Sequence, residues 1–223
     1  MIHWVYDAEL ALRLDPDAAI LRQIAAAPDR PVAFIQFRTK KMSHDQSLAW
    51  IRPLRDLVRS LNPGILLLAN DSATLAAELQ LDGVHLGQDD GPVAAARALL
   101  GDTAWIGRTI RSDVEFQTAL PDLGRAGPDR LDYFGMGTIY GTTTKTGLSP
   151  KGPEFLRPYT ALCGDRIYPI GGIDASKGAE LRAAGARHAA VASSLLTARE
   201  PLEEARKLLL ELQGTAGGTP AIQ

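Results

Sequence analysis

Residues 34–40, FIQFRTK, decide the fold, because an apolar run there stops abruptly at charged side chains. Three further runs end in the same way: LLLAND at 66–71, VHLGQDD at 84–90 and GTIYGTTTK at 137–145. In a parallel α/β barrel the carboxyl ends of the strands face one mouth, where residues distant in sequence converge. These runs therefore predict a barrel whose active site gathers cations and carboxylates.

Short apolar segments alternate with helical ones along the chain. This alternation predicts an α/β fold with a single (β/α)8 TIM barrel over residues 1–213, and the turn-rich tail 214–223 is expected to be disordered. We expect strands at 2–6, 32–37, 64–69, 83–86, 104–107, 131–136, 167–170 and 188–192. We expect helices at about 17–27, 43–61, 72–79, 91–100, 113–120, 153–162, 174–184 and 200–212.

Composition and charge restrict the class of protein. A length of 223 residues fits one large domain, and a net charge of −2 argues against nucleic acid as a partner. No apolar run approaches the roughly 18 residues of a membrane span. Cys163 is the only cysteine, which excludes an intramolecular disulfide. Together with a start that lacks signal-peptide features, this favours the cytoplasm. The sequence leaves the oligomeric state open, a homo-oligomer included.

The strand end QFRTK at 36–40 carries the first candidate site residues. Gln36, Arg38 and Lys40 share one face of a strand, while Phe37 and Thr39 point to the other. On an exposed strand such charges would simply be solvated. Inside a barrel they need partners, and an anionic ligand would supply one.

Two pairs of polar residues, Asn70-Asp71 and Asp89-Asp90, end the third and fourth predicted strands. Mg²⁺ takes one or two carboxylates together with phosphate oxygens of a substrate. Alternatively, Asp71 caps a helix that begins at 72, and Asp89 or Asp90 caps one that begins at 91. Capping accounts for one carboxylate at each place, but not for the position of both opposite Arg and Lys.

Other stretches suggest binding of phosphate. The loop GGI at 171–173 and Ala192-Ser193 follow the last two predicted strands, where many barrels bind phosphate through backbone N–H groups. Gly171 and Gly172 could equally make a tight turn, and the threonine-rich loop with Lys145 could be solvated surface. His85 is expected to be a hydrogen-bonded core residue.

In this order and spacing, the stretches QFRTK, AND, DGVHLGQDD, GRT, GTIYGTTTK, PIGGI and VASS resemble the thiamine phosphate synthase family over nearly the whole chain. The resemblance implies a magnesium-dependent transferase with two small-molecule substrates, aminohydroxymethylpyrimidine diphosphate and hydroxyethylthiazole phosphate. The products would be thiamine phosphate and pyrophosphate.

The resemblance also implies roles for single residues. The whole first motif, Phe37 and Thr39 included, counts as substrate-binding, and Arg38, Lys40, Thr109 and Lys145 count as catalytic. The pyrimidine diphosphate would be held by Gln36, Arg38, Lys40, Asn70 and Lys145, with Thr109 near the ring. The metal Mg²⁺ would be carried by Asp71 and Asp90. The thiazole phosphate would be bound by Thr142, Thr143, Thr144, Gly172, Ala192 and Ser193.

The chain departs from the family pattern at several positions. Thr39 stands where the family has a glutamate, and Thr138 and Gly141 replace prolines. Arg108 and Arg111 add positive charge near the pyrimidine end. The stretch GRTIRS resembles the thiazole tautomerase branch, with Arg111 in place of its histidine. Three alternatives follow: a thiazole tautomerase, a non-catalytic homologue that binds thiazole phosphate or thiamine phosphate, and a phosphate-binding barrel enzyme of another pathway.

Overall fold

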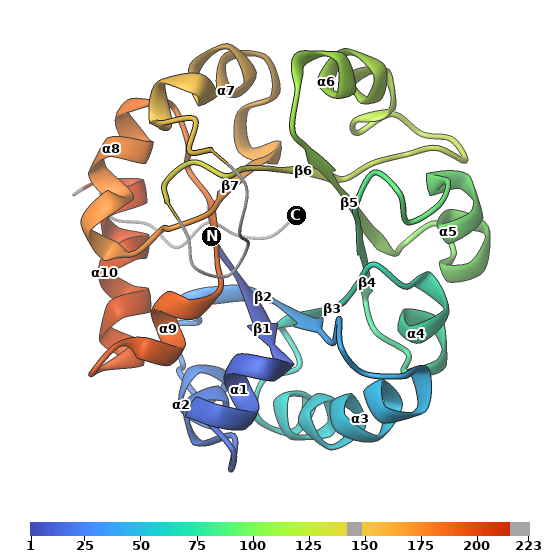
Figure 1. The fold of residues 1–223 in the computed structure, drawn as a ribbon, viewed down its shortest axis with the longest axis vertical. Coiled ribbons are helices and arrows are strands. Elements are labelled where there is room, and N and C mark those ends of the chain that lie inside the picture. Colours follow the sequence, from blue (N-terminus) through green and yellow to red (C-terminus); the bar gives the residue numbers. More distant parts are fainter. Residues whose placement is uncertain (142–148, 215–223) are drawn as a thin grey trace.

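A computed structural model of the chain describes residues 1–141 and 149–214. Eight parallel strands pair in sequence order and close into a barrel, which confirms the predicted fold (Figure 1). The strands are β1 (Ile2–Asp7), β2 (Val32–Arg38), β3 (Leu66–Asn70), β4 (Gly83–Leu86), β5 (Trp105–Ile110), β6 (Tyr133–Gly137), β7 (Ile167–Ile170) and β8 (Ala189–Val191).

Helices form a ring around the outside of the barrel (Figure 1). The α-helices are α1 (Ala8–Leu14), α2 (Ala19–Ala25), α3 (His44–Leu61), α4 (Ala73–Glu78), α5 (Val93–Leu100), α6 (Asp113–Ala119), α7 (Arg157–Cys163), α8 (Gly178–Ala183), α9 (Ser193–Thr197) and α10 (Pro201–Gln213). Short 3₁₀ turns occupy η1 (Leu120–Asp122), η2 (Pro153–Leu156), η3 (Gly164–Arg166) and η4 (Ala175–Lys177). Because each helix returns the chain to the start of a strand, all strand carboxyl ends meet at one mouth.

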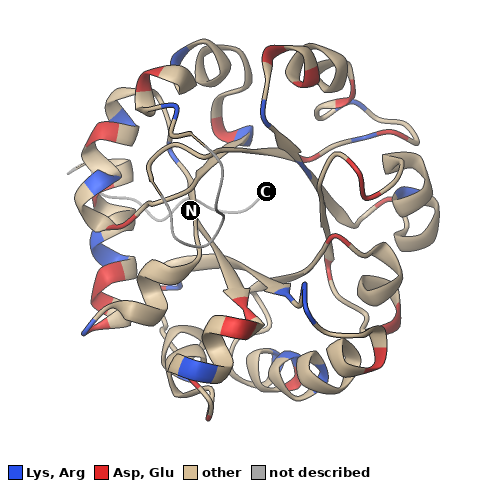
Figure 2. Cartoon of the chain, viewed as in Figure 1, with Lys and Arg blue, Asp and Glu red and all other residues tan. Residues whose placement is uncertain are grey.

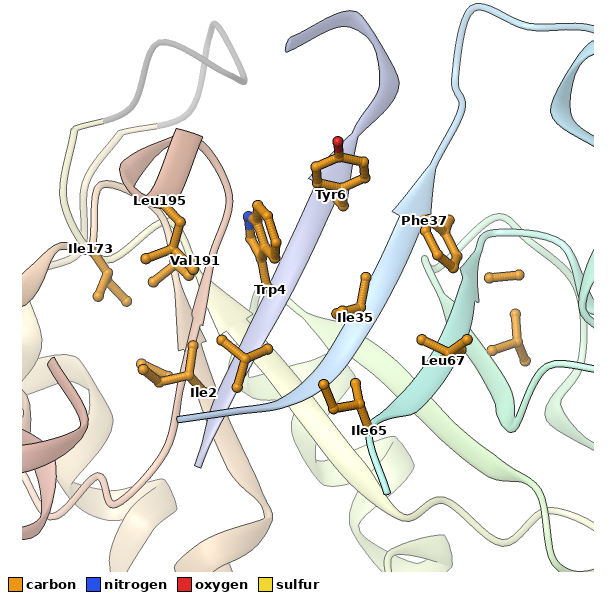
Figure 3. Close-up of a cluster of buried hydrophobic side chains, with 14 of the residues drawn as sticks. Ile2, Trp4, Tyr6, Ile35, Phe37, Ile65, Leu67, Ile173, Val191 and Leu195 are labelled. Carbon is orange, nitrogen blue, oxygen red and sulfur yellow. The ribbon is translucent and has the colours of Figure 1, made fainter. Parts of the chain in front are cut away.

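Alternation along each strand separates an outer core from the barrel interior. On β1, Trp4 and Tyr6 point into the layer between the strands and the helices, where Ile35 and Phe37 of β2 join them (Figure 3). These four side chains are at most 1% exposed. The intervening residues of both strands therefore face the interior, and that face includes His3.

Aromatic side chains fill the barrel interior toward the amino ends of the strands, away from the mouth. Phe34, Tyr133 and Tyr168 pack together there as a second buried cluster, and the ring of His3 stacks on Phe34 with centroids 5.4 Å apart. Layers of inward side chains fill barrels of this type. The interior is therefore hollow only toward the mouth.

Two short helices, α1 and α9, were not predicted. The carboxylate of Asp7 caps α1 by accepting the N–H groups of Glu9 and Leu10 at 3.1 and 3.2 Å, so this helix begins directly at the strand end. Helix α9 has only five residues, too few to show a helical period in the sequence. The predicted tail 214–223 lies outside the described residues from 215 onward.

Charged residues lie mainly on the outer helices and at the ends of strands, while the strands themselves carry few (Figure 2). Within the strands, the charged side chains are those of Asp7, Arg38 and Arg108. Among the described residues, no helix combines the length and the apolar character needed to cross a bilayer.

Candidate active site

A cavity of about 730 Å³ occupies the mouth of the barrel and is lined by residues of all eight strands. It has the position in which barrels of this type carry their active sites. The structure brings most of the predicted site residues together around this one cavity. They are Gln36, Arg38, Lys40, Asn70, Asp71, Asp90, Thr109, Gly172, Ala192 and Ser193.

Two predicted residues are not among those that line the cavity. Phe37 is buried in the outer core, with its ring 6.4 Å from that of Tyr6 and 6.3 Å from that of Trp50. The hydroxyl of Thr39 accepts a hydrogen bond from Ser47 at 2.8 Å. Strand alternation explains both positions. Their inclusion as substrate-binding side chains is therefore wrong.

Four further predicted residues lie outside the described residues, so their placement is not part of the site described here. They are Thr142, Thr143, Thr144 and Lys145.

The cations of β2 differ in their surroundings. The Arg38 guanidinium pairs with the carboxylate of Asp7, and their side chains are only 13% and 4% exposed. Lys40 is half exposed and places its Nζ atom 3.2 Å from Oδ2 of Asp71. Arg38 is thus a buried, neutralised cation, whereas Lys40 remains accessible to a ligand. The sequence did not suggest Asp7 as the partner of a site residue.

Two carboxylates face each other at the ends of β3 and β4. Partial burial of the carboxyl group raises the pKa of Asp90 above its usual value, and the hydrogen bond and charge of Asp71 act in the same direction. The hydrogen bond from the N–H of Gly87 acts in the opposite direction. Oδ2 of Asp90 accepts that N–H at 2.6 Å. Asp71 has a left-handed backbone, with φ of 66°, and its N–H donates to the carbonyl of His85 at 2.8 Å. Backbone contacts therefore hold both acids in place.

None of Asp71, Asp89 and Asp90 caps a helix, so the alternative explanation by capping is wrong. Ser72 caps α4, since its hydroxyl accepts the N–H of Leu75 at 3.1 Å. Helix α5 begins after Pro92 without any side-chain cap. Helix capping therefore does not account for the carboxylates of Asp71 and Asp90.

The donor set fits Mg²⁺ bound jointly with a substrate. Across the described residues, no cluster of three or more His, Cys, Asp or Glu side chains could hold a metal ion by itself. Two adjacent carboxylates are what Mg²⁺ takes when phosphate oxygens and water supply its remaining ligands. Asp71 and Asp90 would hold such an ion.

Polar side chains form the floor of the cavity. Gln36 donates from Nε2 to Oδ1 of Asn70, and the imidazole of His85 lies 3.0 Å from the Tyr133 hydroxyl and 2.9 Å from that of Thr109. Hydrogen-bonding side chains surrounded by aromatic rings suit the edge of a heteroaromatic ring. The predicted hydrogen bonding of His85 is confirmed, but this residue also lines the cavity.

The wall of the cavity across the barrel from β3 and β4 consists of the loops after β7 and β8. Gly171 and Gly172 have φ of 105° and 64°, and a Cβ on Gly172 would lie 2.2 Å from the carbonyl oxygen of Gly141. Only glycine fits such a position. The indole N–H of Trp4 donates to the carbonyl of Ala192 at 3.2 Å and fixes the end of β8. This wall presents backbone and small side chains to the cavity.

The two arginines of the GRTIRS stretch have different positions. Arg108 donates to the carbonyls of Gly91 and Gln88, each at 3.0 Å, and does not line the cavity. Arg111 does line it. The expectation that both add charge near the pyrimidine end is wrong for Arg108, because it has the outward parity of Ile106 and Ile110.

Comparison with known proteins shows to which family the chain is related. The family model described as thiamine monophosphate synthase matches residues 6–195. A thiamine-phosphate synthase of Halorhodospira halophila is 38% identical over 200 residues, which cover 89% of this chain and 91% of that protein. A thiamine-phosphate synthase of Nostoc punctiforme is 34% identical over 208 residues, 93% of this chain but 57% of the relative. The chain thus spans little more than half the length of several relatives that it matches.

Solved structures show the same fold. A thiamine phosphate pyrophosphorylase from Pyrococcus furiosus superimposes with a TM-score of 0.75 at 24% identity, over 96% of each chain. A 3-hexulose-6-phosphate synthase from Salmonella typhimurium reaches 0.64 at 15% identity, over 95% of this chain and 97% of that chain. These likenesses support the barrel alone. The family match and the identity to full-length relatives go further: the chain belongs to the thiamine monophosphate synthase family.

Proposed function

We propose that the protein is a transferase that joins aminohydroxymethylpyrimidine diphosphate to hydroxyethylthiazole phosphate, forming thiamine phosphate and pyrophosphate. The observation that carries this proposal is the pair of uncapped carboxylates, Asp71 and Asp90, beside Lys40 at the barrel mouth. Family membership and the names of the relatives support it.

The reaction needs one bond to break and one to form. The C–O bond between the pyrimidine methylene and the diphosphate breaks, and its electron pair leaves with the pyrophosphate oxygen. The ring nitrogen of the thiazole then supplies the electron pair of the new C–N bond. No proton is transferred. The main task of the protein is therefore to stabilise negative charge on the departing group.

The two substrates would bind on different sides of the cavity. Lys40 and the carboxylate pair would receive the diphosphate, and the floor residues Gln36 and Thr109 would orient the pyrimidine. When bound, Mg²⁺ supplies positive charge to the departing pyrophosphate. The wall formed by Gly172 and Ser193 would bind the thiazole phosphate through its backbone N–H groups. Closely bound substrates exclude water, which would otherwise capture the freed methylene.

A coupled assay tests the proposal directly. Purified protein is mixed with both phosphorylated precursors and Mg²⁺, and thiamine phosphate is measured by fluorescence after oxidation. We expect product with the wild type, and a loss of about 100-fold or more for Asp90→Asn. Asp129→Asn is the matched control, because Asp129 is exposed in the segment that precedes β6, at the opposite end of the strands. Absence of product, with a known synthase active in parallel, would reject the proposal.

A thiazole tautomerase remains the second candidate because of the GRTIRS stretch at 107–112. That reaction needs neither Mg²⁺ nor pyrimidine. Isomerisation that survives a chelator, without coupling, would favour it. Tight binding of thiazole phosphate without any turnover would instead favour a non-catalytic homologue. We also propose a cytoplasmic location, from the cysteine content.

A further inference from the structure

Arg111 is a cavity residue to which the proposed function assigns no role. It directly follows β5 and has the inward parity of Thr109, two residues earlier. Its side chain is exposed at the cavity rim. Within residues 1–141 and 149–214 its guanidinium makes no hydrogen bond or ion pair. Arg108, by contrast, is engaged by two carbonyls.

The backbone of Arg111 is held on both sides. Its N–H donates to the carboxylate of Glu115 at 2.5 Å, and the ammonium of Lys151 donates to its carbonyl. The Lys151 ammonium in turn lies 4.1 Å from the ring centroid of Phe155. Because these contacts fix the backbone, the guanidinium starts from a defined point at the rim, and no described residue occupies its own donors.

Arg111 lies next to the carboxylate pair. Its Nη2 atom lies 3.9 Å from the point where a Cβ of Gly87 would stand, and Oδ2 of Asp90 lies 2.7 Å from the same point. On the other side of the pair, Lys40 lies 3.2 Å from Asp71. Four charged side chains thus follow one another around the mouth from the end of β2 to the end of β5, with a cation at each end.

This arrangement has more cationic donors than the carboxylates satisfy. A magnesium-bound diphosphate carries several oxygens beyond those that coordinate the metal. A guanidinium can donate two parallel N–H bonds to a phosphoryl group, which an ammonium cannot. The Arg111 side of the mouth therefore suits the phosphoryl oxygens that Lys40 does not reach.

We infer that Arg111 binds the diphosphate of the substrate, across the carboxylate pair from Lys40. The inference rests on the proposed function and adds a substrate-binding residue to it. As the C–O bond to the pyrimidine methylene breaks, the electron pair remains on the pyrophosphate, and the N–H groups of Arg111 stabilise that charge.

Calorimetry with Mg²⁺ and inorganic pyrophosphate tests the inference without turnover. Arg111→Gln should weaken the binding of pyrophosphate about ten- to hundredfold, as the loss of a hydrogen bond to a charged group does. Arg111→Lys should fall between this variant and the wild type. The matched control is Arg125→Gln, since Arg125 is an exposed arginine in the segment before β6, at the far end of the barrel. It should bind pyrophosphate as the wild type does.

A second measurement separates a direct contact from a general loss of structure. The affinity for hydroxyethylthiazole phosphate should be the same in wild type and Arg111→Gln, because the loops after β7 and β8 are unchanged. Equal affinity for pyrophosphate in both proteins would overturn the inference. So would a wild type that does not bind pyrophosphate with Mg²⁺, or an equal loss in Arg125→Gln.

The inference and the proposed function can fail separately. A wild type that forms no thiamine phosphate, yet loses pyrophosphate binding on Arg111→Gln, would reject the function and retain the inference. A wild type that forms thiamine phosphate with unchanged pyrophosphate affinity in Arg111→Gln would do the opposite.

Discussion

The carboxylate of Asp7 neutralises the guanidinium of Arg38, and the two residues are direct neighbours in the register between β1 and β2. Arg38 lines the cavity whereas Asp7 does not, and both side chains are little exposed. Breaking a buried ion pair on one side leaves an uncompensated charge, which costs far more than the pair contributes as a whole. Asp7 thus makes it possible for Arg38 to remain buried and charged before an anion arrives.

Asp7→Asn should therefore lower the free energy of unfolding by about 3 kcal/mol, while the amide oxygen can still cap α1. Saturating pyrophosphate with Mg²⁺ should narrow the difference from wild type, because the anion becomes a partner for Arg38. Urea denaturation with and without the ligand measures both effects. Asp29→Asn, which breaks the exposed pair with Arg206, should cost less than about 1 kcal/mol. Similar losses in the two variants would contradict the role given to Asp7.

Asp90→Asn should make the ligand-free protein slightly more stable at neutral pH. The pKa of Asp90 is raised in the fold, so its contribution to stability is present at low pH and is lost as pH rises through that pKa. Because Asp90 is exposed, we expect the melting temperature at pH 7 to rise by only about 1–2 °C. The difference should vanish below pH 3.8, the ordinary pKa of the group.

Addition of pyrophosphate with Mg²⁺ should make the wild type melt at a higher temperature than Asp90→Asn, since the ligand stabilises only the protein that binds it. Thermal unfolding across pH measures both effects. A ligand-free Asp90→Asn variant that melts below the wild type at pH 7 would show that the carboxylates do not oppose each other.

His3 should make the protein sensitive to acid. Burial, together with the nearby His85, lowers the pKa of His3 from 6.5 to about 3. The unfolded chain therefore takes up a proton at a higher pH than the native protein, and stability is lost as pH falls from 6.5 toward 3. His3→Phe should remove up to about 1.4 kcal/mol of this loss for each pH unit. Urea unfolding of both proteins at a series of pH values measures the slope. Parallel profiles would contradict the prediction.

Arg108 should act on the proposed metal site from outside the cavity. Its two hydrogen bonds bracket the residues between Gln88 and Gly91, and thereby position Asp90. Arg108→Gln should weaken the binding of pyrophosphate with Mg²⁺ about tenfold, as the loss of a contact that orients a metal ligand does. A higher Mg²⁺ concentration should restore this binding, whereas it should not restore that of Arg111→Gln. Failure of excess Mg²⁺ to separate the two variants in calorimetry would contradict the distinction.

The sequence predicted the order of the strands and the barrel, and ten of its predicted site residues line the cavity, because short apolar runs end in polar clusters. Alternation alone would also have placed His85 inside and Arg108 outside, since Val84 and Leu86 flank the former and Ile106 and Ile110 share the parity of the latter. The roles given to the site residues stay predictions.

Other features could not be predicted from one chain. The pairing of Asp7 with Arg38 depends on the register of two parallel strands, which no local pattern fixes. The uncapped state of Asp71 depends on whether α4 begins one residue earlier or later, and helix boundaries are the least certain part of such predictions.

The use of Ser72 as the cap of α4 has a practical consequence for experiments on this barrel. Since the helix draws its terminal support from a neighbour, the acid at position 71 can be exchanged without unravelling the scaffold. Under the proposed function, such a variant would still fold but would be inactive. Both substrates could then be soaked into its crystals, and the state before bond formation could be imaged directly.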